Sequence, residues 1–253
     1  MKKFFFSAVV LAASLIESQA SILYQDNFDS YTPGNLVGQG VWAAHSGAGA
    51  KPVQISAGAI TLQQSAGSGE DVNAALGATM GAGDSWYYSF DVSVTGSSAE
   101  NYFAMFMQGT SLFEGKLLVE PFAGSDFTFG VSGSANTVAL GASTWGTGFT
   151  FGSTHRIVVG LNYDTKTATL WVDPASQTST SLSNIGLYQN AVTSIAFRQS
   201  SPTSANYQVI DNLVVATSFQ EALTGVAVPE PSTLAMAALG GFALLSLGFK
   251  RRK

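Results

Sequence analysis

The sequence predicts an all-β domain of two antiparallel sheets packed face to face, with an apolar segment at each end of the chain. Many short segments alternate apolar and polar residues with a period of two, which is the pattern of a strand with one buried face. Glycines fall mostly between these segments, where they favour turns. No stretch of residues 21–228 has the spacing of an amphipathic helix. About a dozen short strands joined by such turns favour a sandwich.

The first element is a predicted secretory signal peptide over residues 1–20. Two lysines precede an apolar run over residues 4–16, and small residues then surround a cleavage site between Ala20 and Ser21. A charged start, a short apolar run and a small-residue exit are the three parts of such a leader, with a buried N-terminal helix as the alternative. Because the exported chain has no cysteine, its core must stabilise it without disulfides.

The strongest strand patterns lie in the middle of the domain. Residues 85–94 carry Trp86 in an apolar stripe, and residues 157–163 and 168–172 alternate on either side of an Asp-Thr-Lys-Thr turn, which predicts a hairpin. Residues 101–108 are apolar on both faces, as in a central strand covered on both sides. Further predicted strands are residues 21–28, 59–64, 116–121, 126–131, 193–199 and 207–215.

The charge of the domain excludes some partners. Residues 21–228 contain five cations and fourteen acidic residues, a net charge of −9 that the terminal lysines and arginines mask in the whole-chain value of −5. Such a domain lacks the basic surface that nucleic acid requires, and anionic lipid headgroups would repel it. We therefore expect no nucleic-acid partner.

Three stretches carry a resemblance to a known family. HRIVVGLNYDTKTATLWVDP in the predicted hairpin, YQDNFDSYTPGNLVGQGVW near the start and VIDNLVVATSF near the end resemble concanavalin-A-like, laminin-G-like jelly-roll domains. The resemblance implies a jelly-roll sandwich over residues 21–225 whose first and last strands are neighbours. The family includes lectins, carbohydrate-binding modules, glycoside hydrolases and polysaccharide lyases. The resemblance therefore supports a fold more than a function.

The acidic residues do not form the pair that a retaining glycosidase needs, two carboxylates about 5 Å apart. Glu70 and Asp71 are adjacent, so on a strand their side chains would face opposite ways. Glu114 and Glu120 are separated by a glycine and followed by a proline, which argues against one continuous strand. We therefore expect no enzymatic activity, and a secreted polysaccharide hydrolase or lyase is the alternative.

The two histidines show no metal-ligand spacing and no nucleophile-elbow motif accompanies them. His155 begins a predicted strand and is expected to be half-exposed. His45 lies in a Ser/Gly loop and is expected to face solvent. A catalytic triad would have to assemble from distant positions.

Binding residues are of two kinds. Asp26, Asp29 and Asp211 lie near the two ends of the domain and could supply oxygen ligands to a structural Ca²⁺, or could serve as turn formers; otherwise we expect no cofactor. Trp42 and Trp171 could stack on sugar rings, with core packing as the alternative.

The C-terminal segment, residues 226–253, has three parts. Pro229, Glu230 and Pro231 interrupt any helix, and residues 232–249 form an uncharged, predicted transmembrane helix of about 27 Å. The four cations at the end of the chain orient this helix with its C-terminus in the cytoplasm and the domain outside; they are Lys250, Arg251, Arg252 and Lys253.

The order of these three parts resembles the PEP-CTERM sorting signal of Gram-negative bacteria. The resemblance implies an exosortase in the inner membrane as partner, cleavage at or near Pro-Glu-Pro, and release or transfer to the cell surface or extracellular matrix. It also associates the protein with exopolysaccharide and biofilm. A plain C-terminal membrane anchor is the alternative.

Overall fold

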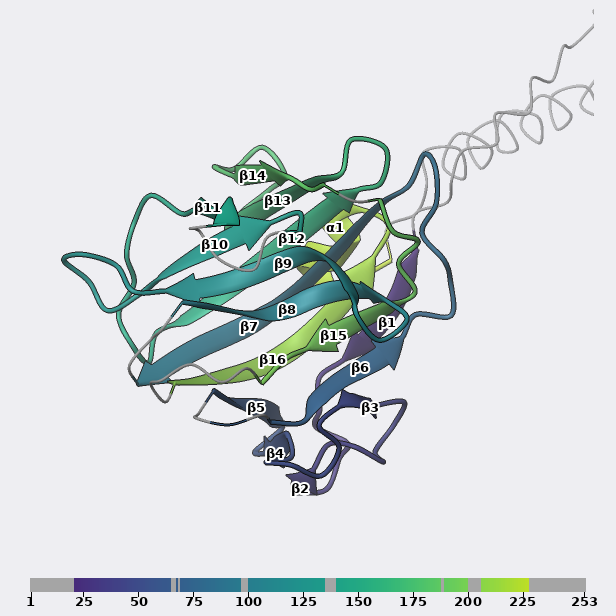
Figure 1. Ribbon diagram of the computed structural model, residues 1–253, viewed down its shortest axis with the longest axis vertical. Helices are drawn as coiled ribbons and strands as arrows, with labels where there is room; N and C mark the ends of the chain where they lie inside the picture. Colours follow the sequence, from purple (N-terminus) through teal and green to yellow (C-terminus); the bar gives the residue numbers. More distant parts are fainter. Residues whose placement is uncertain are drawn as a thin grey trace, which may run out of the picture. The chain divides into compact units, whose positions relative to one another are not determined.

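Two antiparallel sheets form a sandwich in the computed structural model (Figure 1), which confirms the predicted all-β class. The structure describes residues 21–64, 67, 69–96, 100–134, 140–187, 189–199 and 206–227. These residues all belong to one unit, residues 20–229. The predicted signal peptide and transmembrane helix lie outside the described residues. Among the described residues, no helix has the length and apolar character needed to cross a membrane.

Sheet A contains nine strands. Their order is β14 (Leu182–Ile185), β13 (Thr167–Val172), β12 (Thr154–Asn162), β7 (Ser85–Gly96), β16 (Asn206–Ala216), β5 (Ala59–Gln64), β4 (Gln54–Ser56) and β2 (Gly34–Asn35), and β1 (Ile22–Asp26) also pairs with β16. The predicted hairpin is β12 and β13, with Val159 opposite Leu170. The first and last strands are neighbours, as the jelly-roll resemblance implies, because β1 runs antiparallel to the second half of β16.

Sheet B contains seven strands. Their order is β11 (Ser143–Thr144), β10 (Thr128–Ser132), β9 (Leu112–Glu120), β8 (Asn101–Gln108), β15 (Ser194–Phe197), β6 (Asp71–Ala75) and β3 (Ala43–Ser46). The central position of β8, with residues 101–107 all buried, confirms the prediction made from its unbroken apolar run. The sequence also led us to expect no continuous strand through Gly115. That expectation was wrong, because Gly115 adopts a φ of 56° and β9 continues through it.

The core lies between the two sheets. Alternate residues of β7 face it, and Trp86, Tyr88 and Phe90 are all buried there, as the period of two predicts. Phe103 and Phe197 of sheet B meet the Phe90 ring at centroid distances of 6.2 and 5.7 Å. Aromatic contacts between facing strands therefore hold the two layers together.

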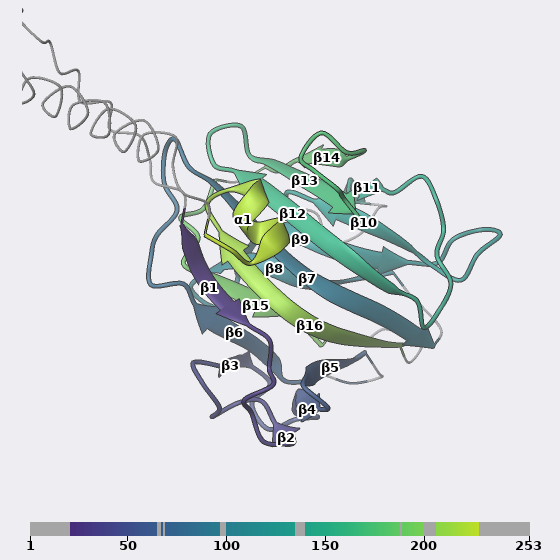
Figure 2. The ribbon, with the colours of Figure 1, turned by 180° about the vertical axis from the view of Figure 1, so that it is seen from behind.

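One helix was missed by the sequence analysis. Helix α1 (Phe219–Thr224) lies on the outer face of sheet A, against β7, β12 and β16 (Figure 2). Ser218 and Glu221 form a capping box at its start, since the Ser218 hydroxyl accepts from the Glu221 amide and donates to its carboxylate. Gly225 ends the helix in the left-handed conformation. Six residues are too few to show the periodicity on which the prediction depended.

Arg156 on β12 fastens α1 to the sheet. Its guanidinium donates to the carbonyl oxygens of Ala222 and Leu223 at 3.2 and 3.3 Å, and the Ser89 hydroxyl also donates to the Ala222 oxygen, so both donors satisfy acceptors at the helix C-terminus. The same group contacts Asp91 at 3.4 Å. Below the helix, the Phe219 ring packs edge-on to Trp171 at 4.9 Å. A charged clamp and an apolar contact thus fix the last described element of the domain.

Candidate functional site

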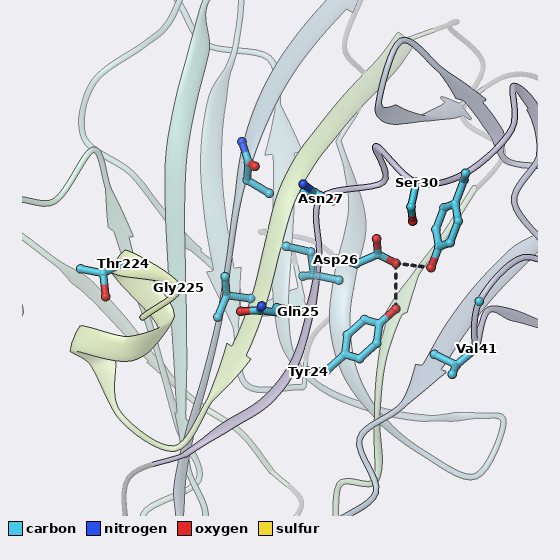
Figure 3. Close-up of a pocket in the computed structure, with 13 residues that line it drawn as sticks. Tyr24, Gln25, Asp26, Asn27, Ser30, Val41, Thr224 and Gly225 are labelled. Atoms are coloured by element: carbon cyan, nitrogen blue, oxygen red, sulfur yellow. Dashed lines mark hydrogen bonds between the residues drawn. The ribbon is translucent and has the colours of Figure 1, made fainter. Parts of the chain in front are cut away.

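A groove lies beside β1, near the residues at which α1 ends (Figure 3). Its volume is about 570 Å³. We call it the β1 groove, and its lining residues are Tyr24, Gln25, Asp26, Asn27, Ser30, Tyr31, Gly40, Val41, Asn212, Leu213, Val214, Thr224 and Gly225. Most of them belong to the opening stretch that carries the family resemblance.

Asp26 organises the wall of this groove. Its Oδ2 accepts hydrogen bonds from the hydroxyls of Tyr24 and Tyr31, at 2.8 and 2.6 Å, and from the indole nitrogen of Trp42 at 2.9 Å. Its Oδ1 accepts from the backbone amide of Phe28 at 2.9 Å, which forms a tight turn at the end of β1. One carboxylate therefore holds two tyrosine rings and the loop between β1 and β3 in place.

Gly40 makes this arrangement possible. A Cβ at this position would overlap the Tyr31 hydroxyl, so only glycine lets Tyr31 reach Asp26. The φ of Gly40 is 56°, which also favours glycine. Gly38 has a φ of 91° but no atom within 4 Å of its potential Cβ. Alanine at Gly40 would both displace Tyr31 and occupy a positive φ, whereas alanine at Gly38 would only occupy a positive φ. Comparing the two variants therefore isolates the effect of displacing Tyr31.

The β1 groove offers uncharged hydrogen-bond donors next to the aromatic rings of Tyr24 and Tyr31. Burial and the Asp26 carboxylate raise the pKa of Tyr31 to about 12 and that of Tyr24 further, so both phenols stay neutral at physiological pH. Within the described part of the chain, no hydrogen bond occupies the side chains of Gln25 or Ser30. Val41 adds apolar surface, with 55% of it exposed. The groove can therefore offer hydrogen bonds and ring contacts together.

The three aspartates predicted for calcium do not assemble as a ligand set. The oxygens of Asp26 face the tyrosines, Trp42 and a backbone amide, while Asp29 accepts from the Asn27 side chain at 2.9 Å. Asp29 lies near enough to Asp211 to raise its pKa, although burial is the larger cause. Among the described residues, no three acidic or histidine side chains are arranged to hold a metal ion. The alternative, that these aspartates form turns, describes Asp26.

The two tryptophans proposed for sugar stacking are both buried, which corrects that prediction. Trp42 is 3% exposed, stacks on Phe197 at 5.6 Å and contacts Phe28 at 6.0 Å on the core side. Trp171 is 6% exposed beneath α1 and donates its indole N–H to the Gln177 carbonyl. Neither presents an open ring face, and only the edge of Trp171 reaches a surface groove.

His155 forms a chain with Ser153 and Asp173 that the sequence analysis did not foresee. The Ser153 hydroxyl lies 2.8 Å from His155 Nε2, and His155 Nδ1 lies 2.8 Å from an Asp173 oxygen. These are the heavy-atom distances of a serine–histidine–aspartate triad. The residues come from one turn and the end of the neighbouring strand, so no long-range assembly was needed.

The protons of this chain run the wrong way for a nucleophile. Ser153 Oγ lies 2.5 Å from the Thr150 carbonyl oxygen, so its hydroxyl proton points to that carbonyl and not to His155 Nε2. The amides of Gly152 and Ser153 already bond to carbonyl oxygens at 2.8 and 3.2 Å. They are not available as an oxyanion hole. The chain is better suited to holding the turn before β12.

The carboxylates of β9 are also too far apart for glycoside hydrolysis. Glu114 and Glu120 lie on one strand six residues apart, which corresponds to about 20 Å. Burial raises the pKa of both groups. Glu70 is buried beside a backbone amide of Gly49, and the adjacent Asp71 bonds the Gln199 amide. None of these acids forms the close pair that a retaining enzyme requires.

The outer face of sheet B carries a cluster of cationic and aromatic side chains around Tyr102. The Tyr102 ring lies between two cations, with Lys116 Nζ 4.9 Å and Arg198 Cζ 4.4 Å from its centroid. Burial lowers the pKa of Lys116 to about 8. His45, expected to face solvent, instead has both ring nitrogens buried without a hydrogen-bond partner, and burial lowers its pKa. That expectation was wrong because β3 packs this loop residue against Phe113.

Comparison with known proteins identifies the C-terminal segment. Residues 227–253 match the family model described as the PEP-CTERM protein-sorting motif. The chain carries a PEP-CTERM sorting signal. This confirms the resemblance read from the three-part tail and marks the chain as an exported protein directed to an exosortase. The motif residues Pro229, Glu230 and Pro231 lie outside the described residues. The comparison with curated proteins found no match.

Solved structures similar to this chain share its sandwich. A sialidase aligns with a TM-score of 0.58 and 16% identity over 81% of this chain and 19% of the sialidase chain. The Emp47p carbohydrate recognition domain aligns with a TM-score of 0.51 and 10% identity over 79% of this chain and 97% of that domain. A botulinum neurotoxin type C structure has a TM-score of 0.51 and 11% identity over 79% and 48% of the two chains. The chain therefore has a lectin-like jelly-roll fold, and it spans about a fifth of the sialidase.

Proposed function

We propose that the protein is displayed at the cell surface or in the extracellular matrix, where it binds polysaccharide through the β1 groove without catalysing a reaction. The sorting signal supports the location, because an exosortase substrate is handed over outside the cytoplasm. The fold is compatible with sugar binding, since one similar structure is a carbohydrate recognition domain. A biofilm polysaccharide is the ligand that this location favours.

The observation that carries the proposal is the pair of tyrosines fixed by Asp26. Tyr24 and Tyr31 present half-buried rings at a groove that also contains the unoccupied polar side chains of Gln25 and Ser30. Sugars have apolar C–H faces and many hydroxyls, so they suit a site that combines rings with donors and acceptors. Because Asp26 already accepts four hydrogen bonds, it positions the rings rather than acting on the ligand.

Binding is tested by affinity electrophoresis of the full-length protein through gels that contain the producer's own exopolysaccharide. The Gly40→Ala variant should lose at least tenfold in affinity, because the new methyl group displaces Tyr31 from Asp26. The Gly38→Ala variant, also at a positive φ but facing open space, is the matched control and should bind like the parent. Equal binding by both variants would refute the role of the groove.

Two further measurements address processing and chemistry. For protein recovered from the cell surface, the intact mass should correspond to a chain that ends near Pro231. A mass that includes residues up to Lys253 would favour a plain membrane anchor. Incubation with the same polysaccharide should release neither reducing ends nor unsaturated sugars. Release of either would support the hydrolase or lyase alternative instead.

A further inference from the structure

A second, smaller groove lies on the outer face of sheet A, on the opposite side of the sheet from the core. Its volume is about 220 Å³, and it runs along β7, β12 and the hairpin turn into β13. We call it the threonine groove because Thr165, Thr167 and Thr169 line it, together with Tyr87 of β7 and Trp171, which follows Thr169 on the same face of β13. Thr167 and Thr169 share a face because they are spaced by two residues along β13, and Thr165 reaches the same groove from the hairpin turn.

The aromatic side of this groove is built on a glycine. Gly160 pairs directly with Tyr87 across β7 and β12, and a Cβ at Gly160 would lie 2.7 Å from the Tyr87 ring. The ring therefore lies over the bare backbone at this point. Phe219 of α1 meets the same ring edge-on at 6.1 Å, and Trp171 lies 6.4 Å away. The docked helix thus holds Tyr87 in a fixed position.

The polar side of the groove has both donors and acceptors to spare. Asn162 links Ser85 and Thr165, since it donates to the Ser85 hydroxyl at 3.0 Å and accepts from the Thr165 hydroxyl at 2.8 Å. Among described residues, the protons of the Ser85 and Tyr87 hydroxyls have no acceptor. Each threonine oxygen keeps an acceptor lone pair. A ligand with many hydroxyl groups is matched by this mixture.

The lining contains no charged side chain, which distinguishes this groove from the β1 groove and its aspartate. A carboxylated or sulfated sugar would find no cation there, and the net charge of −9 over residues 21–228 would repel a polyanion. The volume is below the about 300–1,000 Å³ of sites for drug-sized ligands, which suits one sugar ring rather than several. The Tyr87 ring, the edge of Trp171 and a set of neutral hydroxyls suit an uncharged hexose.

We propose that the threonine groove is a second saccharide subsite, specific for a single uncharged sugar residue of a polysaccharide. The inference rests on the proposed polysaccharide-binding function and names the class of sugar. Two grooves on one domain would also let the protein contact two chains or two points of one chain, which strengthens attachment without further contacts.

The test compares neutral and acidic polymers in affinity gels, with the full-length protein in a detergent that has no sugar headgroup. Dextran, amylose and galactomannan serve as neutral probes, and alginate and hyaluronate as acidic ones. The parent should be retarded by at least one neutral polymer, and Tyr87→Ala should lose that retardation by at least tenfold. The double variant Tyr87→Phe/Thr167→Val keeps the packing and removes only hydroxyls, and it should lose at least threefold. Thr95→Val, on the same face of β7 but outside both grooves, is the matched control.

The outcomes separate this inference from the proposed function. Retardation by acidic polymers alone would overturn the threonine groove while leaving the β1 groove in place. If Gly40→Ala abolishes retardation by neutral polymers and the double variant does not change it, the threonine groove is likewise overturned and the β1 groove is supported. No retardation by any polymer, the producer's exopolysaccharide included, would overturn both proposals. Neutral binding that the double variant weakens and Gly40→Ala does not would support the second subsite.

Discussion

Replacing Asp26 with alanine should destabilise the domain substantially, because four hydrogen-bond donors converge on its carboxylate. Two of them, the Phe28 amide and the Trp42 indole, belong to residues that are 0% and 3% exposed and cannot turn to water. A buried donor left without an acceptor costs about 1–3 kcal/mol. The two tyrosine hydroxyls are at the groove and can be hydrated. We therefore expect a loss of about 2–6 kcal/mol, a large share of the about 5–15 kcal/mol typical of a folded domain.

Urea unfolding followed by tryptophan fluorescence measures this loss. For a slope of about 2–3 kcal/mol per molar urea, the midpoint should fall by about 0.7–3 M with the slope unchanged. Asp29→Ala is the matched control, because Asp29 is exposed and its carboxylate accepts a hydrogen bond from the nearby Asn27 side chain. It should change stability by less than about 0.5 kcal/mol. The reasoning about Asp26 fails if the two variants unfold at the same urea concentration.

Four other predictions concern α1, two shifted pKa values and metal dependence. Arg156→Ala should speed amide hydrogen exchange across α1 by at least tenfold, because the helix loses the guanidinium that binds its last carbonyl oxygens; exchange equal to that of the parent would argue against the clamp. Lys116 has a folded-state pKa of about 8, below its ordinary 10.5, so the unfolded chain binds more protons between these values. The urea midpoint should therefore rise from pH 8 to about pH 10, and Lys116→Met should flatten the rise. The pKa of Tyr31 is raised from 10.0 to about 12 in the folded protein, so the unfolded chain loses this proton at lower pH. The free energy of unfolding should therefore fall from pH 10 to about pH 12, and it should fall less steeply in Tyr31→Phe. Chelation with EDTA should leave the melting temperature unchanged, and a fall would restore the calcium hypothesis.

The sequence predicted the elements that depend on local pattern. The residues of the β12–β13 hairpin and of β7 alternate between apolar and polar, and an Asp-Thr-Lys-Thr turn separates the two hairpin strands. Helix α1 escaped notice because its signal is short: a serine, a glutamate three residues later and a glycine after the last turn. Ser218 followed three residues later by Glu221 is a helix-start signal that does not depend on a periodic apolar face, and it predicts α1.

The candidate sites were harder to predict because they depend on which side of a strand faces the core. Trp42 and Trp171 were predicted either to stack on sugars or to pack in the interior, and their burial agrees with packing. The alternation of β13 places Trp171 on the face opposite Leu170 but does not show that α1 covers that face. Asp26 binds three aromatic partners that lie between Tyr24 on β1 and Trp42 before β3, and only the folded segment brings them together. Likewise, the floor of the threonine groove depends on Gly160 lying opposite Tyr87, a register that alternation alone does not fix.

The pairing of β1 with β16 has a consequence for biosynthesis. Ser21 donates to the Thr217 side chain, a contact between residues 196 positions apart. At about 5–20 residues per second, a ribosome needs roughly 10–40 s to make the partner after the first strand has emerged. During that interval β7 has an unpaired edge, which other chains can occupy. A holding chaperone during synthesis would therefore protect this protein, and any nascent fragment that stops before residue 206 should aggregate.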